Sequence, residues 1–404
     1  MEDNYGKLIS SLAKKNDKRI VLLVMDGVGD CDNAGKGTAL QQARTPNFDA
    51  LAARSALGLH LPVDMAVTPG SGPGHLGLFG YDPLVYKVGR GVLSALGVEF
   101  KLTSQDVAAR LNFCTIDAAS NVTDRRAGRI SDDENHRVLK KVREQLKPPA
   151  GVEVFFETEA EHRAVLVLRG AGLDENIGDT DPQATGVPPL KADRAPHDKS
   201  RTARMAQDII EQVRKILADE PKANMILARG FAEAPKWPSF QERFKLNPAA
   251  VAGYPMYRGV ARLVGMPVVS QPTTAADICS ETVKAMADHT FVFSHFKYTD
   301  KTGEDGDLAG KIKRIEEMDA ALPTLLKGKP DVLIVTGDHS TPPSMKAHSW
   351  HSVPVLLSGP SLRGGDGGRF HEVDCRAGQL GTIYAKHLIP LALAHADKLE
   401  KFGA

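Results

Sequence analysis

The chain has 404 residues, of which 42% are hydrophobic and 25% are charged, and its formal net charge is only +1. This composition is typical of a globular protein with a buried core, and the length predicts roughly two or three domains. The balanced charge gives no general attraction to nucleic acid or to a membrane surface, so we expect neither as a partner.

Cysteine usage and the amino-terminal segment predict a cytoplasmic protein with reduced thiols. The cysteines lie far apart, without CxxC or zinc-ribbon spacing: Cys31, Cys114, Cys279 and Cys375. Residues 1–19 are charged and contain no apolar segment of the kind found in signal peptides. The longest apolar stretches, at 20–25 and 387–396, are too short to span a bilayer.

The first predicted strand, RIVLLVMDG at 19–27, is a continuous apolar run that ends at Asp26. Such a run is typical of a parallel strand buried on both faces. It is followed by TPGSGPGHLGLFGYDP at 68–83, which places Ser71 among glycines and prolines. Because glycine and proline disfavour regular structure, we expect an irregular, rigid loop that exposes the Ser71 hydroxyl.

The middle third of the chain, from about residue 111 to 250, has a different pattern. It contains two amphipathic helical segments, at 136–146 and 203–217. Its strand candidates are EVFFET at 153–158, HRAVLVLRG at 162–170 and NMILARG at 224–230. We therefore predict a second domain, 111–250, inserted into a first domain formed by 1–110 and 251–404.

Two more apolar runs near the end of the chain also finish at acidic residues. HTFVFSHFKYTD, at 289–300, ends at Asp300, and PDVLIVTGDHS, at 330–340, reaches Asp338. The segment 308–328 between them has apolar residues at three- and four-residue steps, which predicts a helix with one buried face. Strands alternating with helices predict an α/β sheet, in which ligands bind at the carboxyl ends of the strands.

Several side chains at or near these strand ends are candidates for metal ligation or catalysis: Asp26, Ser71, His75, Asp300, Glu304, Asp305, Asp307, Asp338, His339, His348 and His351. Each alone has a structural alternative, since Asp338 could cap a helix and DKTGEDGD at 300–307 could be a solvated turn. That turn lacks the EF-hand spacing. Together, converging carboxylates and histidines would repel one another unless cations neutralise them. Two divalent ions roughly 3.5–4 Å apart suit phosphoryl transfer.

The glycines around Ser71 fit none of the common phosphate or nucleophile motifs. GSGPGH lacks the GxGxxG spacing and no GK[ST] follows, so neither a dinucleotide fold nor a P-loop is predicted. GSGPG also differs from the GxSxG nucleophile elbow. We interpret Ser71 as a nucleophile beside the metal ions.

Six segments in order resemble one family over nearly the whole chain. They are VLLVMDGVGD, TPNFDALAARS, TPGSGPGHLGLFGYDP, DRRAGRI, HFKYTDKTGEDGD and TGDHSTPPSMKAHS. The resemblance is to the cofactor-independent (2,3-bisphosphoglycerate-independent) phosphoglycerate mutases of the archaeal-type branch, in the alkaline phosphatase superfamily. It implies a three-layer α/β/α core with an inserted smaller α/β domain.

The resemblance implies two metal sites, holding Mn²⁺ or, alternatively, Mg²⁺, Zn²⁺ or Co²⁺. The first consists of Asp26, Ser71, Asp338 and His339, with Ser71 as the nucleophile that becomes phosphorylated. The second consists of Asp300, Glu304 and His348. Members of the family normally have histidine where this chain has Glu304, so the site becomes harder and more negative, and His351 is an alternative ligand.

Substrate binding is expected from basic residues, because the planar guanidinium matches carboxylate and phosphate groups. The candidates are Arg125, Arg126, Arg129, His162, Arg229 and Lys297. A solvated charge remains the alternative for any single arginine. Lys297 precedes Asp300 by three residues on the expected strand and matches a lysine of the family motif.

The function implied by the resemblance is the interconversion of 3-phosphoglycerate and 2-phosphoglycerate through a phosphoserine intermediate, as in glycolysis and gluconeogenesis. Ser71 takes the phosphoryl group, glycerate reorients, and its 2-hydroxyl takes the group back. Two alternatives stay open: a metal-dependent phosphatase or phosphotransferase of the same superfamily, and a binding protein with a decayed site. The expected partner is the small-molecule substrate, and the sequence leaves the oligomeric state open.

Overall fold

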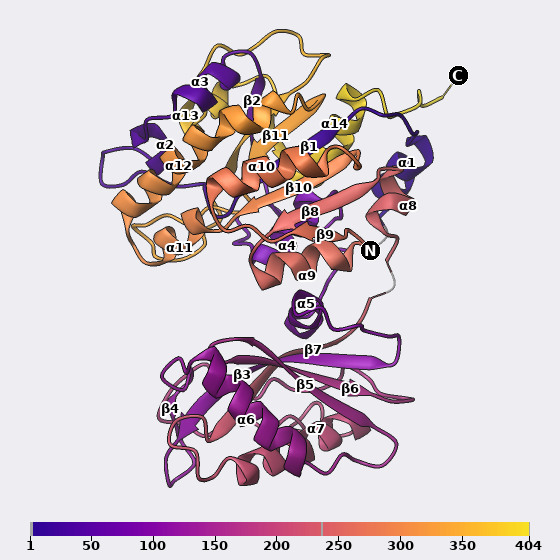
Figure 1. The fold of residues 1–404 in the computed structure, drawn as a ribbon, viewed down its shortest axis with the longest axis vertical. Helices are drawn as coiled ribbons and strands as arrows, with labels where there is room; N and C mark the ends of the chain where they lie inside the picture. Colours follow the sequence, from indigo (N-terminus) through magenta and orange to yellow (C-terminus); the bar gives the residue numbers. More distant parts are fainter. Residues whose placement is uncertain (1–2, 236, 404) are drawn as a thin grey trace. The chain divides into compact units, whose positions relative to one another are not determined.

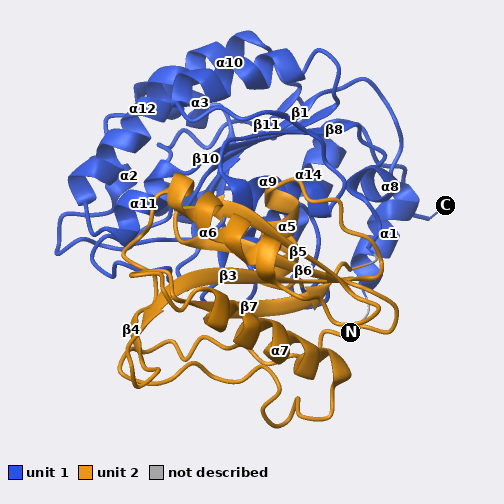
Figure 2. Cartoon of the chain, turned by 60° about the horizontal axis from the view of Figure 1, so that its bottom comes forward, with its two compact units in different colours: residues 1–87, 237–404 blue, residues 88–236 orange. Residues whose placement is uncertain are grey.

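The computed structural model describes residues 3–235 and 237–403. The chain forms two compact units: unit 1 comprises Met1–Lys87 and Trp237–Ala404, and unit 2 comprises Val88–Lys236 (Figure 2). These boundaries differ from the expected insertion at 111–250. Residues 88–110 belong to unit 2 because they include a helix and the start of a strand of its sheet, whereas 237–250 belong to unit 1 because they lead into a strand of the larger sheet.

Unit 1 contains an eight-stranded sheet. Its strands are β1 (Ile20–Met25), β2 (Ala56–Leu61), β8 (Pro248–Ala252), β9 (Val268–Ser270), β10 (Phe291–Phe296), β11 (Val332–Thr336), β12 (Val353–Ser358) and β13 (Gly381–Tyr384). They follow one another in the order β13-β2-β12-β11-β1-β10-β8-β9. The central strands β11, β1, β10 and β8 are parallel, whereas β12 runs antiparallel to both of its neighbours.

Helices cover both faces of this sheet (Figure 1). The core cluster of one face includes residues of α2 (Ala39–Gln42), α3 (Pro46–Ala52), α10 (Ala275–Ala285), α12 (Leu308–Lys327) and α13 (Glu372–Ala377). The other face carries α4 (Ser71–Leu78), α9 (Pro255–Leu263) and α14 (Leu388–His395). The remaining helices of unit 1 are α1 (Asn4–Leu12), α8 (Phe240–Phe244), α11 (Tyr298–Glu304) and the 3₁₀ turn η1 (Ala385–His387).

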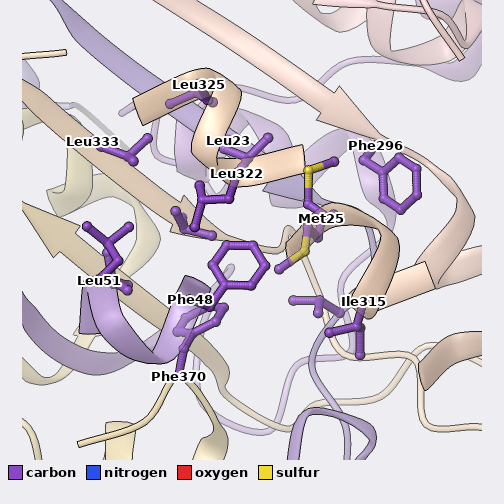
Figure 3. Close-up of a cluster of buried hydrophobic side chains, with 14 of the residues drawn as sticks. Leu23, Met25, Phe48, Leu51, Phe296, Ile315, Leu322, Leu325, Leu333 and Phe370 are labelled. Carbon is purple, nitrogen blue, oxygen red and sulfur yellow. The ribbon is translucent and has the colours of Figure 1, made fainter. Parts of the chain in front are cut away.

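The predicted strand at 19–27 and the predicted helix at 308–328 are both present, as β1 and α12. Every residue of β1 is buried, as expected for a strand with helices on both faces. Successive side chains point to opposite faces, and Leu23 and Met25 pack with Leu322 of α12 (Figure 3). Each aliphatic side chain buried in this way stabilises the fold by about 1.5–3 kcal/mol.

Unit 2 is a smaller α/β body with its own core. Its strands are β3 (Asp106–Ile116), β4 (Val122–Asp124), β5 (Glu153–Ala160), β6 (Arg163–Arg169) and β7 (Met225–Glu233), and its helices are α5 (Arg90–Gly97), α6 (Asp132–Gln145) and α7 (Arg201–Ile216). The sheet runs β4-β3-β6-β5, with β7 on the other side of β3, and the pairs are antiparallel. The strands and helices predicted in the middle third are thereby confirmed.

The expected fold class, a three-layer α/β/α core with an inserted smaller α/β domain, is confirmed. A membrane crossing would need a long apolar helix, and the described part of the chain contains none.

Candidate active site

The register of the central strands brings the predicted acidic residues to one edge of the sheet. Met25 pairs with Phe296 of β10, and Val24 pairs with Thr336 of β11. Asp26 follows β1 directly, and Asp338 lies two residues beyond the end of β11. Parallel strands therefore deliver both carboxylates to the same carboxyl edge, where ligands bind in such sheets.

Four predicted ligands converge at this edge. The imidazole Nε2 of His339 lies 3.4 Å from Asp26 Oδ1, 3.3 Å from Asp338 Oδ2 and 3.4 Å from Ser71 Oγ. A tetrahedral ion bound at about 2.1 Å from each ligand would hold neighbouring ligand atoms about 3.4 Å apart. The donor set of three oxygens and one nitrogen thus has the spacing that a dication needs.

Each of the two carboxylates has one oxygen held by the protein, and the other faces His339. Asp26 Oδ2 contacts His295 Nε2 at 3.1 Å, and Asp338 Oδ1 accepts the Gly27 N–H at 3.1 Å. Asp26 Oδ1 is buried without a hydrogen-bond partner among the described residues. Asp338 Oδ2 is also buried and makes no well-formed hydrogen bond among them, although His75 Nδ1 lies 3.1 Å away. Buried polar atoms left unsatisfied are costly, so this pair fits a bound cation.

Burial and the neighbouring charges keep the side chains of this site in protonation states that bind a cation. Burial works to raise the pKa of Asp26, but Lys297 and His295 outweigh it and hold that pKa well below its usual value. Burial is also the main cause that lowers the pKa of His339. Asp26 is therefore ionised and His339 neutral at pH 7, which are the forms that ligate metals.

Ser71 lies buried at the first position of helix α4, and not exposed on the irregular loop that we expected from 68–83. Proline is tolerated in the first helical turn, so Pro73 does not prevent the helix. A Cβ on Gly74 would lie 2.5 Å from the Asp338 carbonyl oxygen, so glycine there permits close packing. The low helix propensity of glycine and proline predicted a loop here. The helix forms because tertiary packing overrides local propensity, and this packing also requires the glycines.

The residues predicted for the second site lie near one another, but Asp300 lies in helix α11 and not at a strand end. Strand β10 ends at Phe296, and the chain turns at once into the helix. The three-residue spacing therefore places Lys297 and Asp300 on one helical face, and their side chains form an ion pair.

Asp300 and His348 form the centre of this second site. His348 Nε2 lies 3.6 Å from Asp300 Oδ1 and 3.8 Å from Glu304 Oε1. The other ring nitrogen, Nδ1, lies 3.0 Å from the Pro69 carbonyl oxygen and must donate to it, which leaves the Nε2 lone pair free for ligation. Glu304 lies at the rim, with its side chain 53% exposed. Burial and the neighbouring Asp300 raise its pKa.

Lys297 connects the two sites. Its ammonium lies 3.3 Å from Asp26 Oδ2 and pairs with Asp300, so it contacts a carboxylate of each site. The ammonium also donates to the Tyr257 hydroxyl at 3.1 Å, and the Tyr257 ring stacks on His295. No sequence motif indicated that His295 and Tyr257 support the candidate ligands, although His295 lies on strand β10, which leads to Asp300.

The remaining candidates of unit 1, Asp305 excepted, have structural partners. Buried His75 lies with Nδ1 2.9 Å from the Ser71 carbonyl oxygen and 3.1 Å from Asp338 Oδ2. His351 contacts the Ser349 hydroxyl at 2.9 Å and stacks on Trp350. Asp307 caps helix α12, and Asp305 is exposed.

The basic residues predicted to bind substrate, Lys297 excepted, lie in unit 2. Arg125 makes two hydrogen bonds to buried Asp181, at 3.0 and 2.8 Å, and Arg229 lies 3.4 Å from the same carboxylate. Arg126 and Arg129 are exposed. Burial, followed by Arg163, Arg110, Arg126 and Arg129, lowers the pKa of His162 to about 4. The neutral His162 thus lies within a positive field.

Comparison with known proteins supplies the family. A family model described as 2,3-bisphosphoglycerate-independent phosphoglycerate mutase matches residues 52–223. A protein of Thermus thermophilus named "Probable 2,3-bisphosphoglycerate-independent phosphoglycerate mutase" is 48% identical over 402 residues, covering 98% of this chain and 99% of that protein. The chain belongs to this family. An Aquifex aeolicus protein of the same name is 45% identical over 406 residues, covering 98% of this chain and all (100%) of that protein.

Solved structures agree with this family membership. A Pyrococcus horikoshii protein superposes with a TM-score of 0.82 at 28% identity, covering 97% of this chain and 100% of that one. The cofactor-independent phosphoglycerate mutase of Thermoplasma acidophilum has a TM-score of 0.70 at 30% identity, covering 94% of this chain and 100% of that one. The resemblance drawn from the sequence motifs is confirmed, and with it the expectation of an enzyme, an isomerase of the mutase family.

Proposed function

We propose that the enzyme interconverts 3-phosphoglycerate and 2-phosphoglycerate through a phosphoserine formed on Ser71. The observation that carries the proposal is the position of the Ser71 hydroxyl, 3.4 Å from His339 Nε2 and beside two buried, unsatisfied carboxylate oxygens. A serine hydroxyl is a weak nucleophile on its own and needs such an environment to react.

The residues present fit two divalent ions. Asp26, Asp338 and His339 lie close enough together to hold one ion, with Ser71 beside them. Asp300 and His348 would hold the other, and Glu304 would join them from the rim, 3.8 Å from His348 Nε2. His339 lies within reach of this second group as well. When bound, the ions supply charge that lowers the pKa of the Ser71 hydroxyl and stabilises the transferring phosphoryl group. For the second ion we favour Mn²⁺ or Mg²⁺ over Zn²⁺, because two of its three ligands are carboxylates.

The protein orients Ser71 for the two transfers. The Ser71 hydroxyl loses its proton as its oxygen attacks the phosphorus of 3-phosphoglycerate, the bond from phosphorus to the C3 oxygen breaks, and the released C3 oxygen takes up a proton. The 2-hydroxyl of the same glycerate then loses its proton and attacks the phosphoserine, which regenerates the Ser71 hydroxyl. The amino terminus of helix α4 supports the negative phosphoryl group at Ser71, since free N–H groups and the helix dipole attract anions.

Unit 2 supplies the groups that recognise the substrate anion. Arg126 and Arg129 are the exposed members of the predicted set, whereas Arg125 and Arg229 are paired with Asp181. We therefore assign direct contact with the substrate carboxylate or phosphate to Arg126 and Arg129, and support of the adjoining loop to Arg125. The separated, unbridged thiols are consistent with action in the cytoplasm.

A phosphorus NMR time course with 3-phosphoglycerate and Mn²⁺ tests the proposal. We expect 2-phosphoglycerate to appear without free phosphate. The Ser71→Ala variant should lose all turnover and still bind Mn²⁺, and alanine at Arg126 or Arg129 should raise KM. Accumulation of free phosphate by the unchanged enzyme would contradict the mutase proposal and establish the alternative, a phosphatase. Absence of any reaction across several metals would establish a decayed site.

A further inference from the structure

Thr341 lies between the two candidate metal sites. It is fully buried, two residues after His339, in the loop that follows β11. Its hydroxyl oxygen lies 2.6 Å from Asp300 Oδ1 and 2.9 Å from His339 Nδ1. One hydroxyl therefore contacts a ligand of each site.

The hydrogen-bond chemistry of these three groups has only one consistent arrangement. A carboxylate can only accept, so the single hydrogen of the Thr341 hydroxyl goes to Asp300. The same hydroxyl must then accept from His339, so Nδ1 of His339 carries the imidazole hydrogen. This leaves the lone pair on His339 Nε2, the atom that faces Ser71 and the two unsatisfied carboxylate oxygens.

The backbone of Thr341 is fixed as firmly as its side chain. Its N–H donates to the Gly29 carbonyl at 2.9 Å, and its own carbonyl accepts from the ammonium of Lys311 at 2.9 Å. Lys311 also donates to the carbonyls of Gly27 at 2.8 Å and Gly29 at 3.0 Å. Its three ammonium hydrogens thus match three carbonyls, which accounts for a fully buried lysine on α12.

We propose that Thr341, anchored by Lys311, is a positioning residue that couples the two metal sites by fixing the His339 tautomer and the Asp300 carboxylate together. The inference rests on the proposed metal centre. Lys311 ties the loop after β1, which follows Asp26, to the loop after β11, which carries His339. The ligands of both sites are therefore aligned before any ion binds. Outer-sphere partners commonly orient metal ligands in this way.

Mn²⁺ binding to the metal-free protein tests the coupling. We expect Thr341→Val, which keeps the shape and removes the hydroxyl, to weaken Mn²⁺ binding at both sites by about 10- to 100-fold. Thr341→Ser should restore most of the affinity. Thr282→Val is the matched control. Thr282 is also fully buried, and its hydroxyl makes two contacts at 2.6 Å, one within helix α10 and one to strand β10. Lys311→Met should weaken binding and Lys313→Met, on the exposed face of α12, should not.

Nitrogen NMR of the unchanged, metal-free protein gives a second test that needs no variant. The ring nitrogens of His339 should report a neutral imidazole with its hydrogen on Nδ1. The inference would be overturned if Thr341→Val kept its Mn²⁺ affinity or lost affinity at one site only. It would also be overturned if the imidazole hydrogen of His339 lay on Nε2. Failure of the unchanged protein to bind Mn²⁺ would instead contradict the proposed metal centre, and the tautomer would still decide the role of Thr341.

Discussion

Glu304 makes the second candidate site unusual at the scale of single residues. It adds a carboxylate at a position 3.8 Å from His348 Nε2, where the resemblance implies histidine in related chains. Oxygen ligands suit Mn²⁺ and Mg²⁺, whereas an additional imidazole favours Zn²⁺. The side chain at position 304 is therefore expected to set the metal preference of this site.

We predict that Glu304→His raises the affinity for Zn²⁺ relative to Mn²⁺ by about tenfold, or about 1.4 kcal/mol. Competition between the two metals, followed by calorimetry, measures the change. Asp305→His is the control, because Asp305 is exposed and belongs to neither of the two sites. An equal shift in both variants would show that added histidine, and not the ligand position, changes the preference.

The sequence could predict candidate ligands and a candidate nucleophile, but not the residues that hold these side chains in place. Asp26, Asp338 and Ser71 stand beside recognisable motifs, so their chemistry is visible from composition and order. Lys311 lies in an amphipathic helix, where a lysine indicates a solvated charge, yet it is fully buried. Its three carbonyl partners come from loops far apart in the chain, so only the tertiary structure identifies its role.

At the scale of elements, the turn after β1 depends on Gly27. This residue has a φ of +59°, and a Cβ there would lie 2.5 Å from Thr341 Oγ1 and 2.7 Å from Asp300 Oδ1. Gly35, later in the same loop, has a φ of +79° but open space around it. Alanine substitutions at Gly27 and Gly35 therefore distinguish the effect of backbone strain from that of steric conflict.

We predict that Gly35→Ala lowers stability by about 1–2 kcal/mol through backbone strain alone and leaves Mn²⁺ binding unchanged. Gly27→Ala should cost more and should also weaken Mn²⁺ binding, because the new methyl group displaces Thr341 or Asp300. Thermal unfolding and Mn²⁺ titration measure the two effects. Normal Mn²⁺ binding by Gly27→Ala would show that the turn tolerates the displacement.

Strand β2 brings a buried histidine against the end of β11. His60 Nε2 lies 3.0 Å from the Gly337 carbonyl oxygen and 3.0 Å from Thr336 Oγ1, and the residue is fully buried. Burial lowers the pKa of His60 to about 4. The folded protein therefore holds this histidine neutral, whereas the unfolded chain protonates it below about pH 6.5.

It follows that His60 makes stability fall as the pH drops from about 6.5 towards 4, since the unfolded state then binds the additional proton. We predict that the melting temperature of His60→Gln decreases less over this interval than that of the unchanged protein, whatever its value at pH 7. Scanning calorimetry at several pH values measures the two slopes. Identical slopes would assign the acid sensitivity to other groups.

Regular elements were predictable where hydrophobic pattern and packing agree, as in β1 and α12. Helix α4 was not, because its glycines and prolines disfavour a helix locally. Those glycines are required by close approach: a Cβ on Gly77 would lie 2.6 Å from the Pro62 carbonyl oxygen. The sequence pattern shows the cost of glycine in a helix but not the contact that compensates for it.

At the scale of the whole molecule, the candidate chemistry divides between two units with separate cores. All seven expected metal ligands belong to unit 1, and Arg126 and Arg129 belong to unit 2. The chain leaves and re-enters unit 1 at neighbouring points, since the rings of Tyr86 and Trp237 lie 5.2 Å apart. A short linker could therefore close unit 1 after removal of 88–236.

We predict that unit 1 closed with a short glycine-serine linker folds, binds Mn²⁺ with near-native affinity and has no mutase activity. Calorimetric titration and the phosphorus time course measure both properties. The full-length Arg126→Ala, Arg129→Ala double variant is the control, since it should bind Mn²⁺ and lose substrate affinity with both units in place. A folded unit 1 without Mn²⁺ binding would show that unit 2 contributes to the metal centre.

The proposed mutase reaction requires Ser71 to carry the phosphoryl group between the two oxygens of glycerate. Rapid acid quenching during turnover with Mn²⁺ and 3-phosphoglycerate, followed by mass spectrometry of the peptides, measures it directly. We expect a phosphate on Ser71 that forms within one turnover and is absent without substrate. Turnover without phosphate on Ser71, or with phosphate on another residue, would contradict it.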